Sequence, residues 1–263
     1  MRKFGWILLT LIMGLSSCKS SYEALLESGD TGMKYDAALD YFNKGKYVKS
    51  ATIFEALKLP MKGTIQEDTV LYFSALSYYY DNDIYSADPA FASFISIFPR
   101  SPFTESARFY YLDCAYRQTY RYELDQNPTH SAINKIKEFK VDLPTSKYIP
   151  ICDSMLVDLN QRLAQKEYEG AKLYYQMEDY KAAKYALKNV LKENANTMYR
   201  EDISYYIVMS SYHYADMSVS KKRKERFLDF SDAYYNFVGE FPNSKYRKEL
   251  DTLYNKIQEK DIL

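Results

Sequence analysis

Side chains that could act as nucleophiles, bases or metal ligands are sparse in this sequence of 263 residues. The only two histidines, His130 and His213, lie far apart, and neither has a cysteine or carboxylate at the spacing of a metal site. The sequence also lacks a glycine-rich phosphate loop and a Gly-x-Ser-x-Gly nucleophile turn. These features predict a protein without enzymatic activity, cofactor or metal, in which His130 is solvated and His213 is a packed or half-buried ring.

Cysteine is the other reactive side chain, and Cys18 stands in the most informative surroundings. It closes the run Leu15-Ser16-Ser17-Cys18, which follows two positive residues and an almost unbroken apolar stretch of twelve residues. That stretch is too short to cross a bilayer, which takes about 20 residues, but it matches the core of a signal peptide. The run resembles the bacterial lipoprotein signal, whose cysteine receives the lipid. We therefore predict a signal peptide at residues 1–17 and a stable lipid anchor on Cys18; an ordinary export signal with a chance cysteine is the alternative.

The two remaining cysteines, Cys114 and Cys152, each lie in an apolar stretch with helical spacing. Buried free thiols behave as small hydrophobic groups, and this is the interpretation we favour. An oxidising compartment would also permit a disulfide between them, and a separation of 38 residues does not decide the geometry.

The elements that must position these residues follow from one repeated phrase, in which a proline stands five residues after an aromatic residue. It reads Phe94-x3-Phe98-Pro99-x-Ser101-x-Phe103, Phe139-x3-Leu143-Pro144-x-Ser146-x-Tyr148 and Phe237-x3-Phe241-Pro242-x-Ser244-x-Tyr246. A less regular copy, Val190-x3-Asn194-Ala195-x-Thr197-x-Tyr199, lies between the second and the third. Because proline cannot extend a helix, each copy predicts a helix end, with the Ser or Thr capping the next helix.

Successive copies, together with an earlier Leu59-Pro60, are 39 to 51 residues apart, which is the length of one helix pair with its turns. The sequence therefore predicts an all-α protein: an α-solenoid of about five tetratricopeptide-like helix pairs at residues 34–263, which includes a C-terminal capping helix. Residues 18–33 are expected to be the lipidated cysteine and a tether. The expected helices are 35–44 and 47–59, 67–80 and 85–98, 102–122 and 129–143, 148–177 and 181–193, 200–216 and 221–240, and 244–259.

The sequence has 35 basic and 35 acidic residues, so it lacks the basic surface that nucleic acid requires. Its unusual feature is a content of 29 tyrosines. Any one tyrosine at helical spacing belongs more often to a core than to a surface. However, the stretches 72–80 and 110–122 carry more tyrosines than one packing stripe needs. Some of these rings should therefore be exposed, where they could hold an extended peptide.

One run of positive charge, Lys221-Lys222-Arg223-Lys224 with Arg226, stands out. Such a run is usually a solvated helix start, although positive charge at a helix N-terminus opposes the helix dipole. The alternatives are contact with an acidic partner surface or with anionic lipid head groups.

The lipoprotein-like signal, the tether and the five helix pairs together resemble the BamD family, the tetratricopeptide lipoproteins of the outer-membrane β-barrel assembly machinery. The resemblance covers nearly all of the chain after the signal. Two further phrases add to it, Gly45-Lys46-Tyr47-x-x-Ser50-x-x-x-Phe54 and Ala171-x-x-Tyr174-x5-Tyr180-x-Ala182-Ala183.

The resemblance implies a scaffold without catalytic activity, held at the outer membrane by its lipid and facing the periplasm. Its amino-terminal repeats would receive the carboxy-terminal strand of unfolded barrel proteins, in a groove near Tyr41, Tyr72 and Tyr79. Its later repeats would dock on the periplasmic repeat domains of the central barrel protein. The residues expected at that docking surface are Arg200, Lys221, Lys222, Arg223 and Arg226.

The repeats fit a second hypothesis equally well. A different periplasmic tetratricopeptide lipoprotein, which organises a cell-envelope, secretion or motility complex, would show the same helix pairs. Only the length and the anchor favour the assembly machinery.

Overall fold

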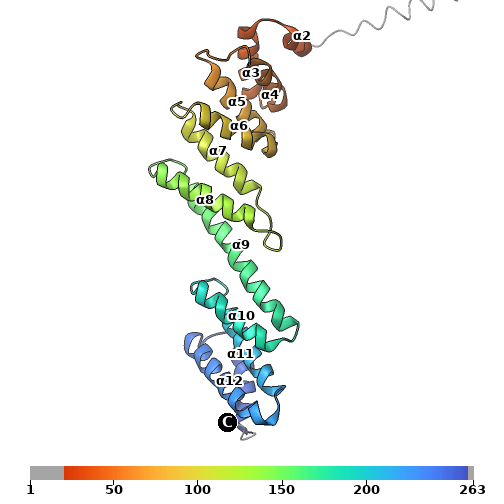
Figure 1. Ribbon diagram of the computed structural model, residues 1–263, viewed down its shortest axis with the longest axis vertical. Coiled ribbons are helices and arrows are strands. Elements are labelled where there is room, and N and C mark those ends of the chain that lie inside the picture. The colour runs from red at the N-terminus through yellow and green to blue at the C-terminus, as the bar shows by residue number, and fades with distance from the viewer. Residues whose placement is uncertain (1–20, 260–263) are drawn as a thin grey trace, which may run out of the picture. The chain divides into compact units, whose positions relative to one another are not determined.

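The computed structural model describes residues 21–259, and this part of the chain is entirely helical (Figure 1). None of these helices combines the length and the apolar character that crossing a membrane requires. The predicted signal peptide and Cys18 lie outside the described residues. The twelve helices of residues 21–259 are α2 (Ser21–Glu27), α3 (Thr31–Asn43), α4 (Tyr47–Leu57), α5 (Glu67–Tyr80), α6 (Ile84–Ile97), α7 (Thr104–Arg117), α8 (Asn127–Asp142), α9 (Ile149–Gln176), α10 (Tyr180–Glu193), α11 (Arg200–Asp216), α12 (Ser220–Glu240) and α13 (Arg247–Glu259).

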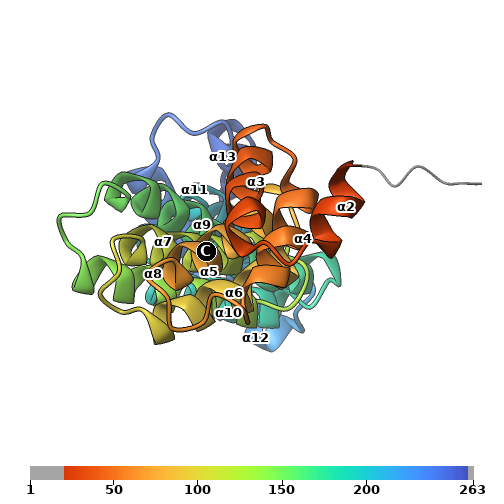
Figure 2. The same ribbon diagram turned by 90° about the horizontal axis from the view of Figure 1, so that it is seen from above.

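The chain divides into two compact units. The first holds the described residues up to Gln118 together with Asn134–Tyr148, and the second holds Thr119–Ile133 together with the described residues from Ile149 on. Within each unit, helices that follow one another in the chain pack together, α3 to α7 in the first and α9 to α12 in the second (Figures 1 and 2). Packing on sequence neighbours is the rule of a solenoid. The predicted all-α solenoid of tetratricopeptide-like pairs, five in number and followed by α13, is therefore confirmed.

The repeated phrase folds into the same helix end four times. In each copy the backbone N–H of the residue before the proline position donates to the carbonyl four residues earlier, at 2.8 or 2.9 Å. The helix then ends, as the sequence predicts. The four bonds join Phe98 to Phe94, Leu143 to Phe139, Asn194 to Val190 and Phe241 to Phe237.

The Ser or Thr of each copy does not cap the next helix, so that part of the prediction is wrong. Its hydroxyl accepts a hydrogen bond from the backbone N–H two residues later, as Ser101 does from Phe103 at 3.2 Å. The following helix α7 begins only at Thr104, and the residue at its N-terminal boundary, Phe103, makes no side-chain cap bond. The hydroxyl thus stabilises the turn before the helix, in the same way at Ser146, Thr197 and Ser244.

The last aromatic residue of each copy packs back on the helix pair that the copy closes. It lies flat on an aromatic ring from the first helix of the preceding pair, and offset-stacked rings of this kind add to the energy of burial. The stacked pairs are Tyr72–Phe103, Phe109–Tyr148, Tyr168–Tyr199 and Tyr205–Tyr246, with ring centroids 4.5, 4.0, 4.9 and 3.9 Å apart. Eight of the aromatic rings therefore pack within the fold in these stacked pairs.

Several expected boundaries differ from the structure. Part of the predicted tether is helical, because α2 covers Ser21–Glu27 and Tyr22 packs edge-on against Tyr41, with ring centroids 5.6 Å apart. Helix α7 ends five residues early, at Arg117. Helix α8 begins at Asn127 rather than at Thr129, whose buried hydroxyl donates to the Gln126 side chain at 2.8 Å.

Both Cys114 and Cys152 are fully buried free thiols, which confirms the interpretation favoured from the sequence. Burial raises the pKa of the Cys114 thiol to about 12. At pH 8 its reactive thiolate fraction is then on the order of one part in ten thousand. We expect neither thiol to react with a maleimide in the folded protein, and both to react after unfolding, as measured by peptide mass spectrometry. A disulfide between them, or rapid labelling of the native protein, would contradict this.

Candidate functional site

Tyr72 and Tyr79, predicted near an exposed peptide groove, are core residues, with 6% and 7% of their surfaces exposed. The Tyr72 ring stacks on Phe103, and its hydroxyl accepts a hydrogen bond from Ser106 at 3.0 Å. Rings enclosed in this way offer little area to a partner, so a groove near these two residues would be lined by other side chains. Tyr41 is half-buried and lies next to Lys46 and Lys49. Its role in peptide binding remains a prediction.

The Tyr79 hydroxyl belongs to a buried polar cluster. It donates to the Asp113 carboxylate at 2.5 Å and accepts from the Arg117 guanidinium at 2.6 Å. Arg117 also donates to Asp113 at 2.7 Å and lies over the Tyr79 ring. Burial and the bond to Asp113 raise the pKa of Tyr79, so its proton stays in place at neutral pH. The cluster is a structural joint between α5 and α7.

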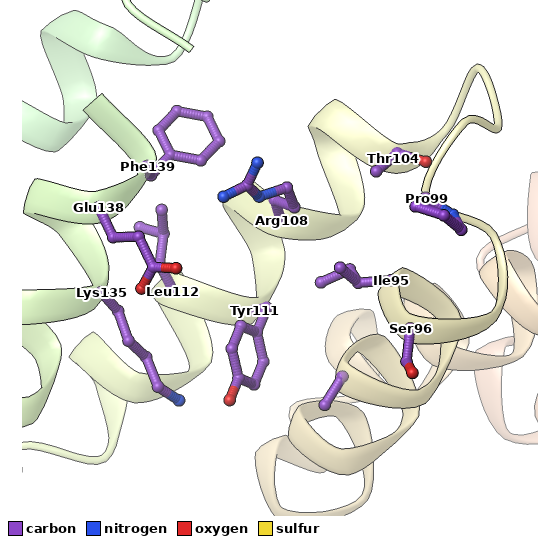
Figure 3. Close-up of a pocket in the computed structure, with 11 residues that line it drawn as sticks. Ile95, Ser96, Pro99, Thr104, Arg108, Tyr111, Leu112, Lys135, Glu138 and Phe139 are labelled. Carbon is purple, nitrogen blue, oxygen red and sulfur yellow. The ribbon is translucent and has the colours of Figure 1, made fainter. Parts of the chain in front are cut away.

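A groove on the first unit is a stronger candidate for binding. It measures about 350 Å³ and lies between α6 and α8, with α7 as its floor. Figure 3 shows the Tyr111 ring between Ile95, on α6, and Lys135, on α8. Apolar atoms come from Ala92, Ile95, Pro99, Tyr111, Leu112 and Phe139. Concave surfaces with an apolar lining and a few placed polar groups are typical of ligand sites.

Charges of both signs line this groove, from Arg108, Lys135 and Glu138. The Lys135 ammonium lies 3.7 Å from the centre of the Tyr111 ring and 3.8 Å from the Asp88 carboxylate. Arg108, on the floor, forms an ion pair with Asp142 at the end of α8. A ligand carboxylate could replace the long Lys135–Asp88 contact at small cost, because partly exposed ion pairs contribute little. The arrangement suits an extended peptide with apolar side chains and a negative group.

The second unit has a groove at the same place in its helix pairs. It measures about 430 Å³, and its lining comes from α10, α11 and α12. In the register of the repeated phrase, Phe237 corresponds to Phe139 and Glu240 to Asp142. This groove is more acidic, because Asp229, Asp232 and Glu240 all line it.

Arg200, predicted as a docking residue, lies in the second groove and is already bonded. It forms an ion pair with Glu240 and donates to the Ala195 carbonyl at 2.6 Å. The bond to Glu240 raises the pKa of Arg200. A partner that used Arg200 would therefore have to compete with Glu240.

The basic run divides into two kinds of residue. Arg223 and Arg226 are half-buried and contact the turn before α12, whereas Lys221 and Lys222 are exposed. The structure thus keeps apart residues that look equivalent in the sequence.

Catalytic chemistry finds no support in the described residues. Within residues 21–259 no three His, Cys, Asp or Glu side chains are arranged to hold a metal ion. His130 is exposed, and the half-buried His213 stacks on Tyr180 with ring centroids 4.7 Å apart, both as expected. Burial lowers the pKa of His213.

Comparison with known proteins identifies the class. The sequence matches the outer membrane lipoprotein family YfiO over residues 29–227, which is most of the chain. The chain therefore belongs to this family, and the resemblance to BamD is confirmed. No curated protein matches the sequence significantly. Among solved structures, a thermophilic TPR protein from Thermus thermophilus is 16% identical, with 86% of this chain and 98% of that chain covered and a TM-score of 0.33.

Sequence reasoning missed both grooves. Their walls come from helices more than 30 residues apart in the sequence, as with Ile95 and Lys135, and no local pattern reports such a pairing. The one usable signal was the repeated phrase, because its register already places corresponding residues of the two grooves at equal offsets.

Proposed function

We propose that this protein is a non-catalytic scaffold in the assembly and insertion of β-barrel outer-membrane proteins. In this function it binds the central barrel protein of the machinery and unfolded barrel substrates. It acts from the periplasmic side of the outer membrane, held there by lipid on Cys18. Membership of an outer membrane lipoprotein family and the stacked helix pairs support the proposal.

The groove between α6 and α8 is the proposed receiving site for an unfolded substrate segment. The observation that carries this is Lys135, held over Tyr111 at the edge of an apolar groove. A carboxy-terminal strand offers apolar side chains for the groove and a terminal carboxylate for the ammonium. Extended peptides gain specificity from such alternate side-chain pockets.

We expect Ser96→Trp to weaken binding of a carboxy-terminal barrel peptide at least about tenfold, because the new ring fills the groove. Ser93→Trp is the matched control, since Ser93 is also exposed on α6 but does not line the groove. Fluorescence anisotropy of a labelled peptide measures both. Equal affinities for the two variants would show that the peptide does not bind in this groove.

Lys135→Gln separates the two parts of the recognition. It should weaken binding of the peptide with a free carboxylate and leave the amidated peptide unchanged. An equal loss of affinity for both peptides would show that Lys135 does not bind the terminal carboxylate.

Docking on the central barrel protein is assigned to the fifth pair, α11 and α12. Affinity purification from detergent-solubilised membranes tests this and the function as a whole. A stoichiometric barrel protein with periplasmic repeat domains is the expected partner. Recovery of cell-wall enzymes, or of a secretion or motility complex, would favour the other class of lipoprotein and refute the assembly function.

A further inference from the structure

The turn between α11 and α12, in the helix pair assigned above to docking on the barrel protein, combines positive charge with exposed apolar side chains. It runs from Asp216, the last residue of α11, to Ser220, the first of α12. Met217 and Val219 in this turn are 70% and 68% exposed. A single exposed apolar side chain is ordinary at a protein surface, but here two stand in one short turn directly before the basic run.

Two arginines of the basic run hold this turn in shape. Arg223 donates to the Asp216 carbonyl at 2.6 Å and forms an ion pair with the Asp216 carboxylate at 3.0 Å. Arg226 donates to the Ser218 hydroxyl, and its guanidinium lies 3.8 Å from the centre of the Tyr214 ring. Arg223 is therefore paired with an acidic side chain, whereas Arg226 contacts neutral groups, and both side chains hold the turn in shape.

Three lysines next to the turn are left without such contacts. Lys221, Lys222 and Lys224 are exposed, and none of them forms an ion pair with a described residue. The one acidic side chain among them, Glu225, is exposed as well, which leaves a local excess of two positive charges. Positive charge at the start of a helix opposes its dipole, so helix stability does not explain these lysines.

The lysines and the exposed apolar side chains lie within one stretch of twelve residues, 217–228. Lys221, Lys224 and Leu228 follow one another at intervals of three and four residues, so they share a face of α12. Leu228 is 49% exposed, and Val219 is the residue directly before the helix. Apolar side chains bordered by lysines are the composition of segments that lie in a membrane interface, where long lysine side chains reach the head groups.

We propose that the α11–α12 turn docks on an anionic phospholipid bilayer, with Met217 and Val219 entering the head-group layer and the three lysines contacting lipid phosphates. An acidic protein surface fits less well, because it would match the lysines but leave the two apolar tips uncovered. The turn would be a second attachment to the membrane, additional to a lipid on Cys18. Two attachments on one chain reinforce each other. The inference does not depend on the assembly function, because no barrel protein is involved.

Vesicle binding of a chain without the lipid tests the proposal directly. Residues 19–263 serve, because the buried core of the described chain runs from Ala38 to Ile257 and is complete in them. We expect co-sedimentation with vesicles that contain phosphatidylglycerol, no binding to pure phosphatidylcholine, and release by salt. Absence of binding to the anionic vesicles at low salt would overturn the proposal.

Charge variants locate the surface. Each lysine near an anionic membrane contributes about fivefold, so Lys221→Gln, Lys222→Gln and Lys224→Gln together should weaken vesicle binding on the order of 100-fold. The control changes the same number of charges on exposed lysines elsewhere in the same unit, at Lys192, Lys248 and Lys256. Equal losses in the two triple variants would refute a specific surface. If the first triple variant kept its vesicle binding but lost a protein partner on affinity purification, an acidic protein would be the occupant and the proposal would be wrong.

A fluorescent reporter tests insertion. The sequence has one tryptophan, Trp6, so residues 19–263 contain none. Met217→Trp therefore gives a single signal, which should shift to the blue with anionic vesicles and become protected from a water-soluble quencher. Tyr185→Trp, at an exposed position of α10, should show neither change. An unshifted signal at position 217 on bound protein would exclude insertion of the turn.

Discussion

Replacing the phenylalanine that opens each copy of the repeated phrase should be the most destabilising single change in this protein. Phe94, Phe139 and Phe237 are buried, with 0%, 2% and 2% of their surfaces exposed. Each ring is packed between helices, and its removal leaves a cavity that the packed helices cannot fill. We expect Phe94→Ala, Phe139→Ala and Phe237→Ala each to lower the free energy of unfolding by about 3–5 kcal/mol, measured by urea denaturation.

Neighbouring exposed residues provide the controls. Ile97 and Val141 are 52% and 79% exposed, and each lies within three residues of one of these phenylalanines. Ile97→Ala and Val141→Ala should change the free energy of unfolding by less than about 0.5 kcal/mol. Costs below about 1 kcal/mol at all three phenylalanines would contradict the repeat architecture itself.

The sequence predicted the fold well because one local rule, repeated, determines it. A proline after an apolar helical face ends each helix, and the recurrence of the copies every 39 to 51 residues predicts the pairs before any contact is known. The error over Ser101 has a local cause too. A hydroxyl two residues after a proline can bond either the N–H of a turn or that of a helix start, and only the turn geometry decides between them.

The candidate site was harder to predict, because exposure is a property of the assembled helices. Tyr72 and Tyr80 have the same side chain on the same helix, yet Tyr72 is buried and Tyr80 is 45% exposed. The difference arises because Phe103, which lies 31 residues after Tyr72, covers the Tyr72 ring. In the basic run, Arg223 and Lys224 are adjacent, but only Arg223 can reach back to Asp216. Such pairings depend on tertiary distance.

The contact between α5 and α7 contains a buried charge, the Asp113 carboxylate, whose compensation affects the stability of the fold. Asp113 is only 5% exposed, and its carboxylate accepts hydrogen bonds from Arg117 and Tyr79. If one partner of a buried ion pair is removed, the remaining charge stays in a medium of low polarity, and this costs more than the pair itself contributes. Arg117 is the partner that carries the compensating charge, and its side chain is 42% exposed.

We therefore expect Arg117→Ala to lower the free energy of unfolding by about 2 kcal/mol, below the range for fully buried pairs, because the exposed part of the guanidinium is screened by water and the Tyr79 hydroxyl still bonds Asp113. Arg121→Ala, a few residues on at a side chain that is 75% exposed, should cost less than about 0.5 kcal/mol. Asp113→Asn removes the buried charge, so in that background Arg117→Ala should cost less than about 1 kcal/mol. An equal cost in both backgrounds would mean that Arg117 stabilises the protein by packing over the Tyr79 ring, and that charge compensation is not the reason for its position.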